Sequence, residues 1–342
     1  MPVTQFGRIS APDQAWLAKA PPEEILDPDL PIIDTHHHLW QRPDHRYLLH
    51  DLIADLRTGH RVVATVFLQC HAMYRADGPE EMRPVGETEF VAGIAAMSDS
   101  GGYGPTKVAA GIVGFADLTL GERVEAVLEA HIRAGGGRFR GVRHSGNWDV
   151  DTVIGNGAPG PDIYKRADFR KGLSRLSALG LSLDAWVFHT QLTDVIELAR
   201  AFPATNIIMG HVGGVLGYGP YTGRRDEIFS AWKADIAELA KCPNVTMKLG
   251  GMMMRAALFD YKAAERPVTS EELAALWRPY IETCIERFGV RRCMFESNFP
   301  VEKMGIGWAA LWNAFKRIAA GASPDEKRAL FHDTAQRVYR LG

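Results

Sequence analysis

Residues 31–40 read PIIDTHHHLW, an apolar, β-branched run that ends in three consecutive histidines. The apolar part predicts a buried strand, and the histidines come at its carboxyl end. In a strand, residues two apart point the same way, so His36 and His38 share one face while His37 faces the other. Two imidazoles on one face could hold a divalent metal ion. A polar strand end with hydrogen-bonded histidines is the alternative.

Seven similar runs follow along the chain. Together with the first they predict eight strands, at residues 31–38, 61–70, 107–118, 139–144, 181–189, 206–213, 244–251 and 292–300. Apolar runs this continuous are what the strands of a fully buried parallel sheet need. The segments between them are long enough for the crossover helices that parallel strands require.

Helical periodicity supports these crossovers. In residues 168–180 apolar side chains recur at Phe169, Leu173, Leu176 and Leu179, and the segment ends in a glycine. Further helices are predicted at 190–203, 225–243, 270–289, 308–321 and 325–342. Strand followed by helix, eight times, predicts an α/β fold of the (β/α)8 barrel type. A doubly wound open sheet is the alternative, but no GxGxxG motif occurs at the first strand–helix turn.

The domain organisation follows from the position of the first strand. Residues 31–342 are predicted to form one barrel domain. Residues 1–30, which include Pro12, Pro21, Pro22 and Pro28, are predicted to be an extension that lies over the barrel, and its N-terminal mouth is the suggested place. Long loops at 71–90, 145–167 and 214–225 follow the second, fourth and sixth strands, and such loops usually shape substrate pockets.

Composition narrows the class of function. The hydrophobic fraction is 46%, the charged fraction 23% and the formal net charge −2. No basic run indicates a nucleic-acid or membrane partner, which leaves a small-molecule substrate. Four cysteines fit no zinc-finger spacing and are expected to be free thiols in a reducing cytosol. We expect a cytoplasmic protein without a signal peptide, and a homo-oligomer stays open.

Two more histidines end predicted strands. His189 ends the fifth strand and His211 the sixth, and in a barrel all strand ends converge on one mouth. One such histidine alone is more often structural. Together with His36 and His38, however, they predict a metal site or an acid–base site.

Six motifs in this order resemble one family. IIDTHHHLW, FRGVRHS, AWVFHTQL, IIMGHVGG, VTMKLGG and CMFESNFPVEK are similar to those of the amidohydrolase-2 family. The closest resemblance is to its branch of lactonases that act on sugar acids, muconolactone and pyrone dicarboxylate. The resemblance implies a barrel hydrolase that places His36 and His38 at the first-strand ligand positions, and His189 and His211 at those of the fifth and sixth strands.

One position departs from the family. The family usually carries an aspartate at the end of the eighth strand, and here Asn298 takes its place. An amide does not protonate usefully near neutral pH, so Asn298 cannot be a general base. Glu296 lies two residues earlier, about 6–7 Å deeper in the barrel, and a buried carboxylate there needs a metal, Lys or His partner. An outward-facing or structurally paired Glu296 is the alternative. The candidate catalytic residues are Glu296, Asn298, His189 and His211.

Cationic residues near strand ends are candidates for binding substrate. Arg143 offers a guanidinium fork for a carboxylate, and His144 is its neighbour on the opposite face. Lys248, near the end of the seventh strand, could pair with Glu296 or with a substrate carboxylate. Structural ion pairs are the alternative for both cations.

The leading hypothesis is hydrolysis of a small, carboxylate-bearing lactone, or a related cyclic or acyl compound, by water attack at a carbonyl. We expect one divalent ion per chain, zinc first and manganese as the alternative, with candidate ligands His36, His38, His189, His211 and Glu296. A metal-independent lactonase, a non-oxidative decarboxylase and an inactive barrel used for binding remain alternatives.

Overall fold

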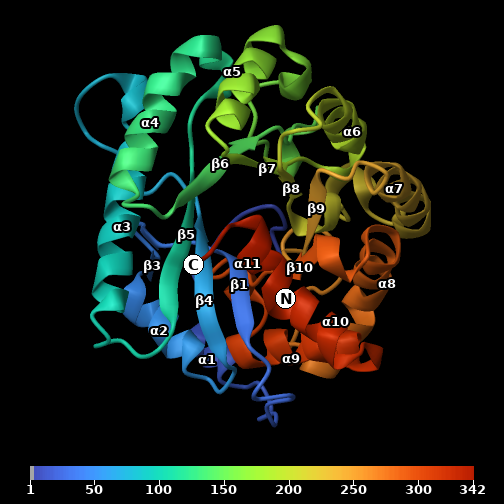
Figure 1. The fold of residues 1–342 in the computed structure, drawn as a ribbon. Helices are drawn as coiled ribbons and strands as arrows, with labels where there is room; N and C mark the ends of the chain where they lie inside the picture. The colour runs from blue at the N-terminus through green and yellow to red at the C-terminus, as the bar shows by residue number, and fades with distance from the viewer. Residues whose placement is uncertain (1–3) are drawn as a thin grey trace.

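The computed structural model describes residues 4–342 and confirms the predicted (β/α)8 barrel. Eight parallel strands form one sheet in which neighbours follow chain order, and Figure 1 looks along the barrel axis. Their bounds are β1 Ile32–His37, β4 Val62–Leu68, β5 Lys107–Gly114, β6 Phe139–Ser145, β7 Ser182–Trp186, β8 Ile207–Met209, β9 Val245–Leu249 and β10 Cys293–Phe295. Each lies within a predicted run or within one residue of it. A short hairpin, β2 Trp40–Gln41 and β3 Arg46–Tyr47, follows β1.

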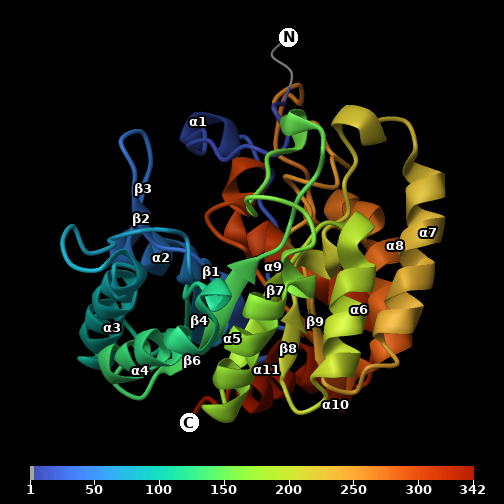
Figure 2. The same ribbon diagram turned by 90° about the horizontal axis from the view of Figure 1, so that it is seen from above.

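Helices surround the strands (Figures 1 and 2). The main ones are α2 Leu49–Leu56, α3 Val85–Asp99, α4 Val124–Ala134, α5 Ala167–Ala178, α6 Leu192–Ala201, α7 Arg225–Leu239, α8 Ser270–Phe288 and α9 Trp308–Ile318. The short α1 is Gln14–Leu17, and α10 Pro324–Arg328 and α11 Thr334–Val338 end the fold. The loop predicted at 71–90 is shorter than expected. Helix α3 starts at Val85, directly after Pro84, whose fixed φ suits a helix start.

The core has two layers. Inside the barrel, side chains such as Ile33, Val66 and Met294 pack together, and Tyr339 and Leu341 from the C-terminal segment join them. A larger cluster lies between the strands and the helices. Figure 2 places the C-terminus at one end of the molecule and α1, near the start of the described chain, at the other. The C-terminal residues therefore close the end of the barrel opposite the mouth where the strands finish.

The first and last barrel strands meet along a seam. In the described chain, β1 and β10 carry no ladder pairing, and the parallel bridge between His37 and Phe299 lies just beyond β10. Other bonds complete the closure: the Asn298 N–H donates to the His36 carbonyl at 2.8 Å, and the Ser297 N–H donates to an Asp34 carboxylate oxygen at 2.8 Å. The seam thus lies directly beside the predicted site.

The structure corrects the placement suggested for the N-terminal extension. Its first described part crosses the mouth at the carboxyl ends of the strands, not the N-terminal mouth. Gly7 donates to the Met254 carbonyl at 3.1 Å, and the Phe6 ring packs on Tyr218 and Tyr261 from the loops after β8 and β9. These loops offer aromatic faces at this mouth, whereas the opposite mouth is already filled by the C-terminal residues. We call residues 4–10 the strap.

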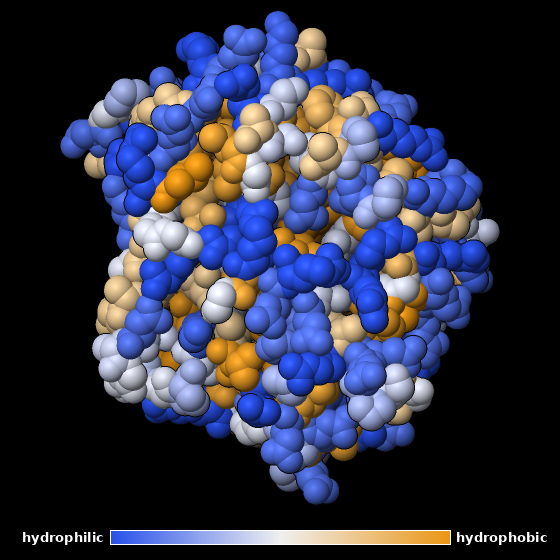
Figure 3. All heavy atoms as spheres, viewed as in Figure 1, coloured by the Kyte–Doolittle hydropathy of each residue, from blue (hydrophilic) through white to orange (hydrophobic). Residues whose placement is uncertain are grey.

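The surface is that of an ordinary globular protein. On the face shown in Figure 3, hydrophilic residues surround separate hydrophobic patches. Within residues 4–342, no helix combines the length and apolarity needed to cross a membrane. The four cysteines are free, and three of them are buried.

Candidate active site at the carboxyl ends of the strands

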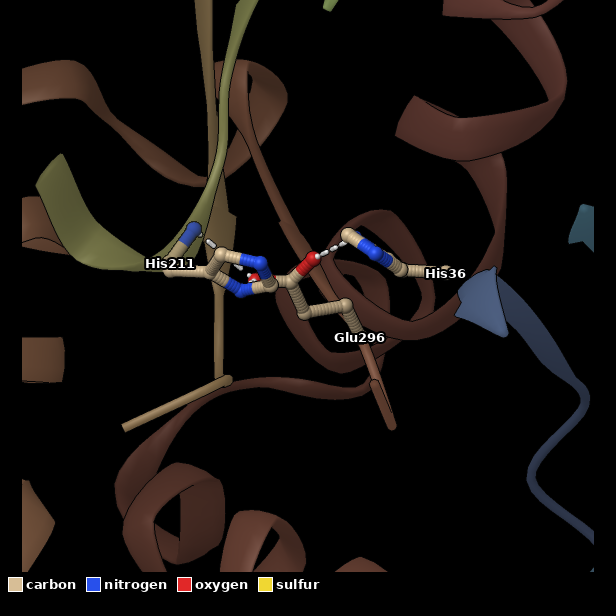
Figure 4. Close-up of side chains that lie close together, drawn as sticks. All are labelled: His36, His211 and Glu296. Carbon is tan, nitrogen blue, oxygen red and sulfur yellow. Dashed lines mark hydrogen bonds and ion pairs between the residues drawn. The ribbon is translucent and has the colours of Figure 1, made fainter. Parts of the chain in front are cut away.

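Glu296 lies at the centre of the candidate site, between two imidazole rings (Figure 4). Its Oε2 is 2.7 Å from Nδ1 of His36, and its Oε1 is 2.8 Å from Nδ1 of His211. The backbone N–H of His211 also donates to Oε1, at 2.9 Å. Glu296 is fully buried, so the partner that a carboxylate needs there consists of two histidines. These three residues each offer one ligand atom, all within 4.8 Å of one another, and could hold a metal ion.

The charges of this group follow from its surroundings. Burial is the main cause that lowers the pKa of His36 well below its ordinary value, so the ring is neutral. Burial alone would raise the pKa of Glu296, but His211 and His36 outweigh it and hold that pKa well below its usual range. The group is therefore an ionised carboxylate that accepts hydrogen bonds from its neighbours.

These bonds fix which nitrogen of each ring carries hydrogen. An ionised carboxylate only accepts, so Nδ1 of His36 and Nδ1 of His211 are the donors. Nδ1 of His38 lies 2.8 Å from the Leu68 carbonyl, which also only accepts. In neutral imidazoles the hydrogen on Nδ1 leaves a lone pair on Nε2. Carboxylate or carbonyl partners behind a histidine are the usual support of a metal-binding ring.

The pair His36 and His38 fits a metal ion. Their Nε2 atoms are 3.2 Å apart, and burial also lowers the pKa of His38 well below its ordinary value. Two lone pairs facing each other repel unless a positive charge lies near them. Nitrogen ligands at about 2.0–2.1 Å from a tetrahedral zinc ion are themselves about 3.3 Å apart. The predicted shared face of His36 and His38 thus has the spacing that zinc requires.

Arg143 supplies a positive charge at the same place. Its Nη1 is 3.2 Å from Nε2 of His36, and its Nη2 donates to the Gln69 carbonyl at 2.7 Å. Burial lowers the pKa of Arg143, but an arginine remains charged at any ordinary pH. The guanidinium therefore lies beside the histidines, where it can meet an anionic group of a substrate.

His189 lies away from the Glu296 group. Strand β7 ends at Trp186, and His189 begins a 3-10 turn, so its side chain does not continue the strand alternation. Its ring packs edge-on against Tyr221, with the ring centres 5.2 Å apart, and Nδ1 has no hydrogen-bond partner among residues 4–342. Burial lowers the pKa of His189 to about 4, so this ring too is neutral.

Two of the predicted substrate contacts lie elsewhere. Lys248 does not pair with Glu296: its Nζ is 2.9 Å from Asp184 on β7, two strands away in the barrel, and both side chains are buried. The Tyr339 hydroxyl donates to the same Asp184 oxygen at 2.7 Å. His144 faces the helices, with its ring against Phe115 and Phe169. A structural ion pair thus accounts for Lys248.

Asn298 is held by a second buried carboxyl group. Its Nδ2 donates to Glu302 at 3.1 Å, and the Met253 N–H donates to the other Glu302 oxygen at 3.0 Å. Glu302 is fully buried, in the turn that residues 302–304 form after the last barrel strand. Burial raises the pKa of Glu302 to about 8.

Sequence reasoning missed three polar residues near the site: Gln69, Asp184 and Glu302. Asp184 carried a usable signal, because an aspartate within the apolar strand run LSLDAW needs a cationic partner. Gln69 carried a similar one at the end of VVATVFLQ. Nothing in the local pattern indicated that Glu302 is buried, since it follows the last barrel strand in a turn.

Comparisons with known proteins agree with this fold. A family model described as Amidohydrolase matches residues 33–341. The uncharacterized protein y4mH of Sinorhizobium fredii is 33% identical over 92% of this chain and 99% of its own length. An L-fucono-1,5-lactonase of Burkholderia multivorans is 26% identical over 90% of this chain and 96% of its own. A crystal structure of an amidohydrolase from Burkholderia multivorans with bound zinc has a TM-score of 0.68 at 25% identity, covering 91% and 99% of the two chains.

Proposed function

This chain belongs to the amidohydrolase family, and from that membership we propose that it opens a small lactone ring by attack of water on the ring carbonyl. The family and the lactonase relatives support an enzyme with hydrolase activity. The observation that carries the proposal is the ionised Glu296 between the imidazoles of His36 and His211 at the barrel mouth. Because Nδ1 of each ring donates to Glu296, Nε2 of each ring is left as the acceptor.

His36 and His38 would hold one divalent ion through Nε2, with zinc as the first candidate and manganese as the second. When bound, such an ion polarises a carbonyl and lowers the pKa of water. We assign these two histidines because the Glu296 oxygens already accept three hydrogen bonds. The zinc bound to the similar Burkholderia multivorans structure supports the choice of metal.

The remaining steps use residues of the chain itself. Nε2 of His211 accepts the proton that the attacking water loses and returns it to the ring oxygen as the C–O bond between that oxygen and the carbonyl carbon breaks. Glu296 stabilises the intervening imidazolium through Nδ1–H. Arg143 donates to the oxygen that becomes negative, and then to the carboxylate of the opened product. Asn298 acts only through hydrogen bonds of its amide and takes no proton.

The test joins metal analysis with a lactone panel. The protein is purified without added metal or chelator, its metal content is measured, and hydrolysis of L-fucono-1,5-lactone and simpler 1,5-lactones is followed. We expect about one zinc or manganese per chain, and a loss of at least about a hundredfold in kcat/KM for a His36→Ala/His38→Ala double variant. Full activity in that variant would refute the assignment.

A metal-independent version of the same hydrolysis is the second candidate. The contact between Arg143 Nη1 and His36 Nε2 favours it, because the guanidinium can supply the positive charge beside the facing lone pairs. Activity that survives complete metal removal, and falls in Arg143→Lys, would select this version. Release of carbon dioxide without ring opening would instead identify a decarboxylase.

A further inference from the structure

A small cavity lies beside the candidate active site, at the ends of β4, β5 and β6. Its volume is about 210 Å³, and its lining includes Gln69, Phe115, Asp117, Ser145 and Gly157. Complete small-molecule sites usually measure about 300–1,000 Å³, so this space suits one part of a ligand. The Gln69 carbonyl accepts a hydrogen bond from Arg143, which also contacts His36. The cavity and the histidines therefore lie on either side of one guanidinium.

Two buried side-chain amides lie at this cavity: Gln69 lines it, and Asn147 lies next to Gly157, which lines it. Gln69 is 1% exposed, and its side chain makes no hydrogen bond with any residue from 4 to 342. Asn147 is equally buried and its Oδ1 is also unpartnered within the described chain. A Cβ on Gly157, which lines the cavity, would come within 2.5 Å of that Oδ1. Leaving a buried polar group unsatisfied costs about 1–3 kcal/mol, so each amide has a strong need for a partner.

The chemistry of these groups selects the ligand. A side-chain amide offers both a donor and an acceptor, and a hydroxyl group can satisfy either. The charged residues at the rim are already occupied: Asp117 accepts the N–H of Thr119 at 2.9 Å, and Arg166 pairs with Asp168. Among the described residues that line the cavity a carboxylate would meet no free cation, whereas an uncharged alcohol would meet the free amide of Gln69.

We propose that this cavity is a subsite for the hydroxyl groups of the substrate, with Gln69 as a specificity-determining residue, and that the substrate is a polyhydroxylated lactone. The inference rests on the proposed lactonase function. It adds that the ring carbonyl lies at the histidines while ring hydroxyls reach past Arg143 to the amide of Gln69.

The experiment compares two lactones of equal ring size. L-fucono-1,5-lactone carries hydroxyls and δ-valerolactone carries none. Gln69→Leu should lower kcat/KM for the first by at least about tenfold, which corresponds to about 1.4 kcal/mol, and change the second by less than about twofold. Gln336→Leu, the same chemical change on the exposed surface of α11, is the matched control and should change neither.

A stability measurement separates specificity from structure. Because Gln69 has no protein partner within the described residues, Gln69→Leu removes an unsatisfied amide and should leave Tm unchanged or raised. The proposal would be overturned if kcat/KM fell equally for both lactones, with or without a lowered Tm. No response of either substrate would overturn it as well.

Binding distinguishes failure of the subsite from failure of the lactonase proposal. If the wild type hydrolyses neither lactone, calorimetric titration with L-fuconate tests the cavity directly. Binding that weakens at least about tenfold in Gln69→Leu and not in Gln336→Leu would support the subsite while the hydrolysis proposal fails. Equal binding by all three proteins, or binding by none, would refute the subsite.

Discussion

Glu296 accepts bonds from both His36 and His211, so replacing it disturbs two rings at once. In Glu296→Gln the amide group must donate to one ring, which turns that ring's hydrogen to Nε2. We expect kcat/KM to fall by about 10- to 100-fold, the usual effect of losing such a supporting carboxylate.

The readout for this variant includes nitrogen NMR of the imidazoles, which reports the position of the hydrogen directly. Asp55→Asn is the control, because Asp55 is a buried carboxylate paired with Lys303 and Tyr47 away from the histidines. Unchanged tautomers in Glu296→Gln would contradict the account of how the rings are oriented.

Asn298 gives a second prediction at the residue scale. Asn298→Asp restores the residue usual in the family, but it sets a carboxyl group against Glu302, at the 3.1 Å contact that Nδ2 now makes. We expect the single variant to be less stable by about 1–3 kcal/mol, because two buried acids cannot both ionise there.

The double variant Asn298→Asp/Glu302→Gln exchanges acid and amide and should recover most of the loss. Denaturant unfolding of the four proteins in this cycle provides the coupling energy. Additive effects would show that Glu302 does not act on position 298.

Glu302 also predicts a pH dependence. Burial raises its pKa from 4.5 to about 8, so the folded protein keeps a proton there that the unfolded chain loses near pH 4.5. Stability from this group is complete below pH 4.5 and is lost as the pH rises through 8. Asp34 and Glu87 shift in the same direction, but only to about 7.

Between pH 7 and 8, therefore, Glu302 dominates the slope. The wild type should lose up to about 1.4 kcal/mol of unfolding free energy over that unit. In Glu302→Gln the slope should be clearly smaller, because only Asp34 and Glu87 still lose protons over that range. An identical slope in both proteins, measured by denaturant unfolding, would exclude a neutral Glu302.

The sequence predicted the direction of site side chains correctly for residues that lie on strands. Alternation placed His36 and His38 on one face, and their Nε2 atoms do lie 3.2 Å apart. It failed where the chain leaves the strand, as at His189, which starts a turn after β7 has ended. It also failed for Lys248, because the choice between Asp184 and Glu296 as partner depends on side-chain depth, which alternation does not give.

At the scale of elements, the turn after β9 supports the site. Gly251 has φ +67°, and a Cβ there would lie 1.8 Å from Nδ1 of His211. Gly251→Ala must therefore move the His211 ring. We expect a loss of about a hundredfold in kcat/KM, since a displacement of about 1 Å at a reacting group has effects of that size.

Gly289 is the matched control for this prediction. It has φ +76°, and a Cβ there would meet no heavy atom within 4 Å. Both alanine variants should lose about 1–2 kcal/mol of stability from backbone strain, but Gly289→Ala should keep its activity. Equal activity of the two would show that His211 tolerates the shift.

Elements were predictable for one physical reason. Strands buried on both faces require continuous apolar runs, and all eight were found in such runs. Boundaries were less predictable, because they depend on local capping. Helix α3 begins at Val85 within an expected loop, where Glu87 in its first turn accepts the N–H groups of Cys70 and Ala72 at 3.0 and 2.7 Å.

At the scale of the whole molecule, the strap and the C-terminal residues take opposite ends of the barrel. Periodicity predicts neither position, because short segments without a repeating pattern are placed by the surfaces they meet. The strap follows the rings of Tyr218 and Tyr261, and Leu341 fills the closed end. Only the assembled barrel presents these surfaces.

The seam between β1 and β10 has a consequence for how the molecule opens. His36 belongs to the first barrel strand and Glu296 follows the last, so the hydrogen bond between them also joins the two edges of the barrel. A ligand that strengthens this hydrogen bond would slow amide hydrogen exchange in both strands, although His36 and Glu296 are 260 positions apart along the chain. Conversely, a nascent chain released before β10 is synthesised would contain the four candidate histidines, His36, His38, His189 and His211. It would lack the Glu296 carboxylate, which accepts hydrogen bonds from two of them.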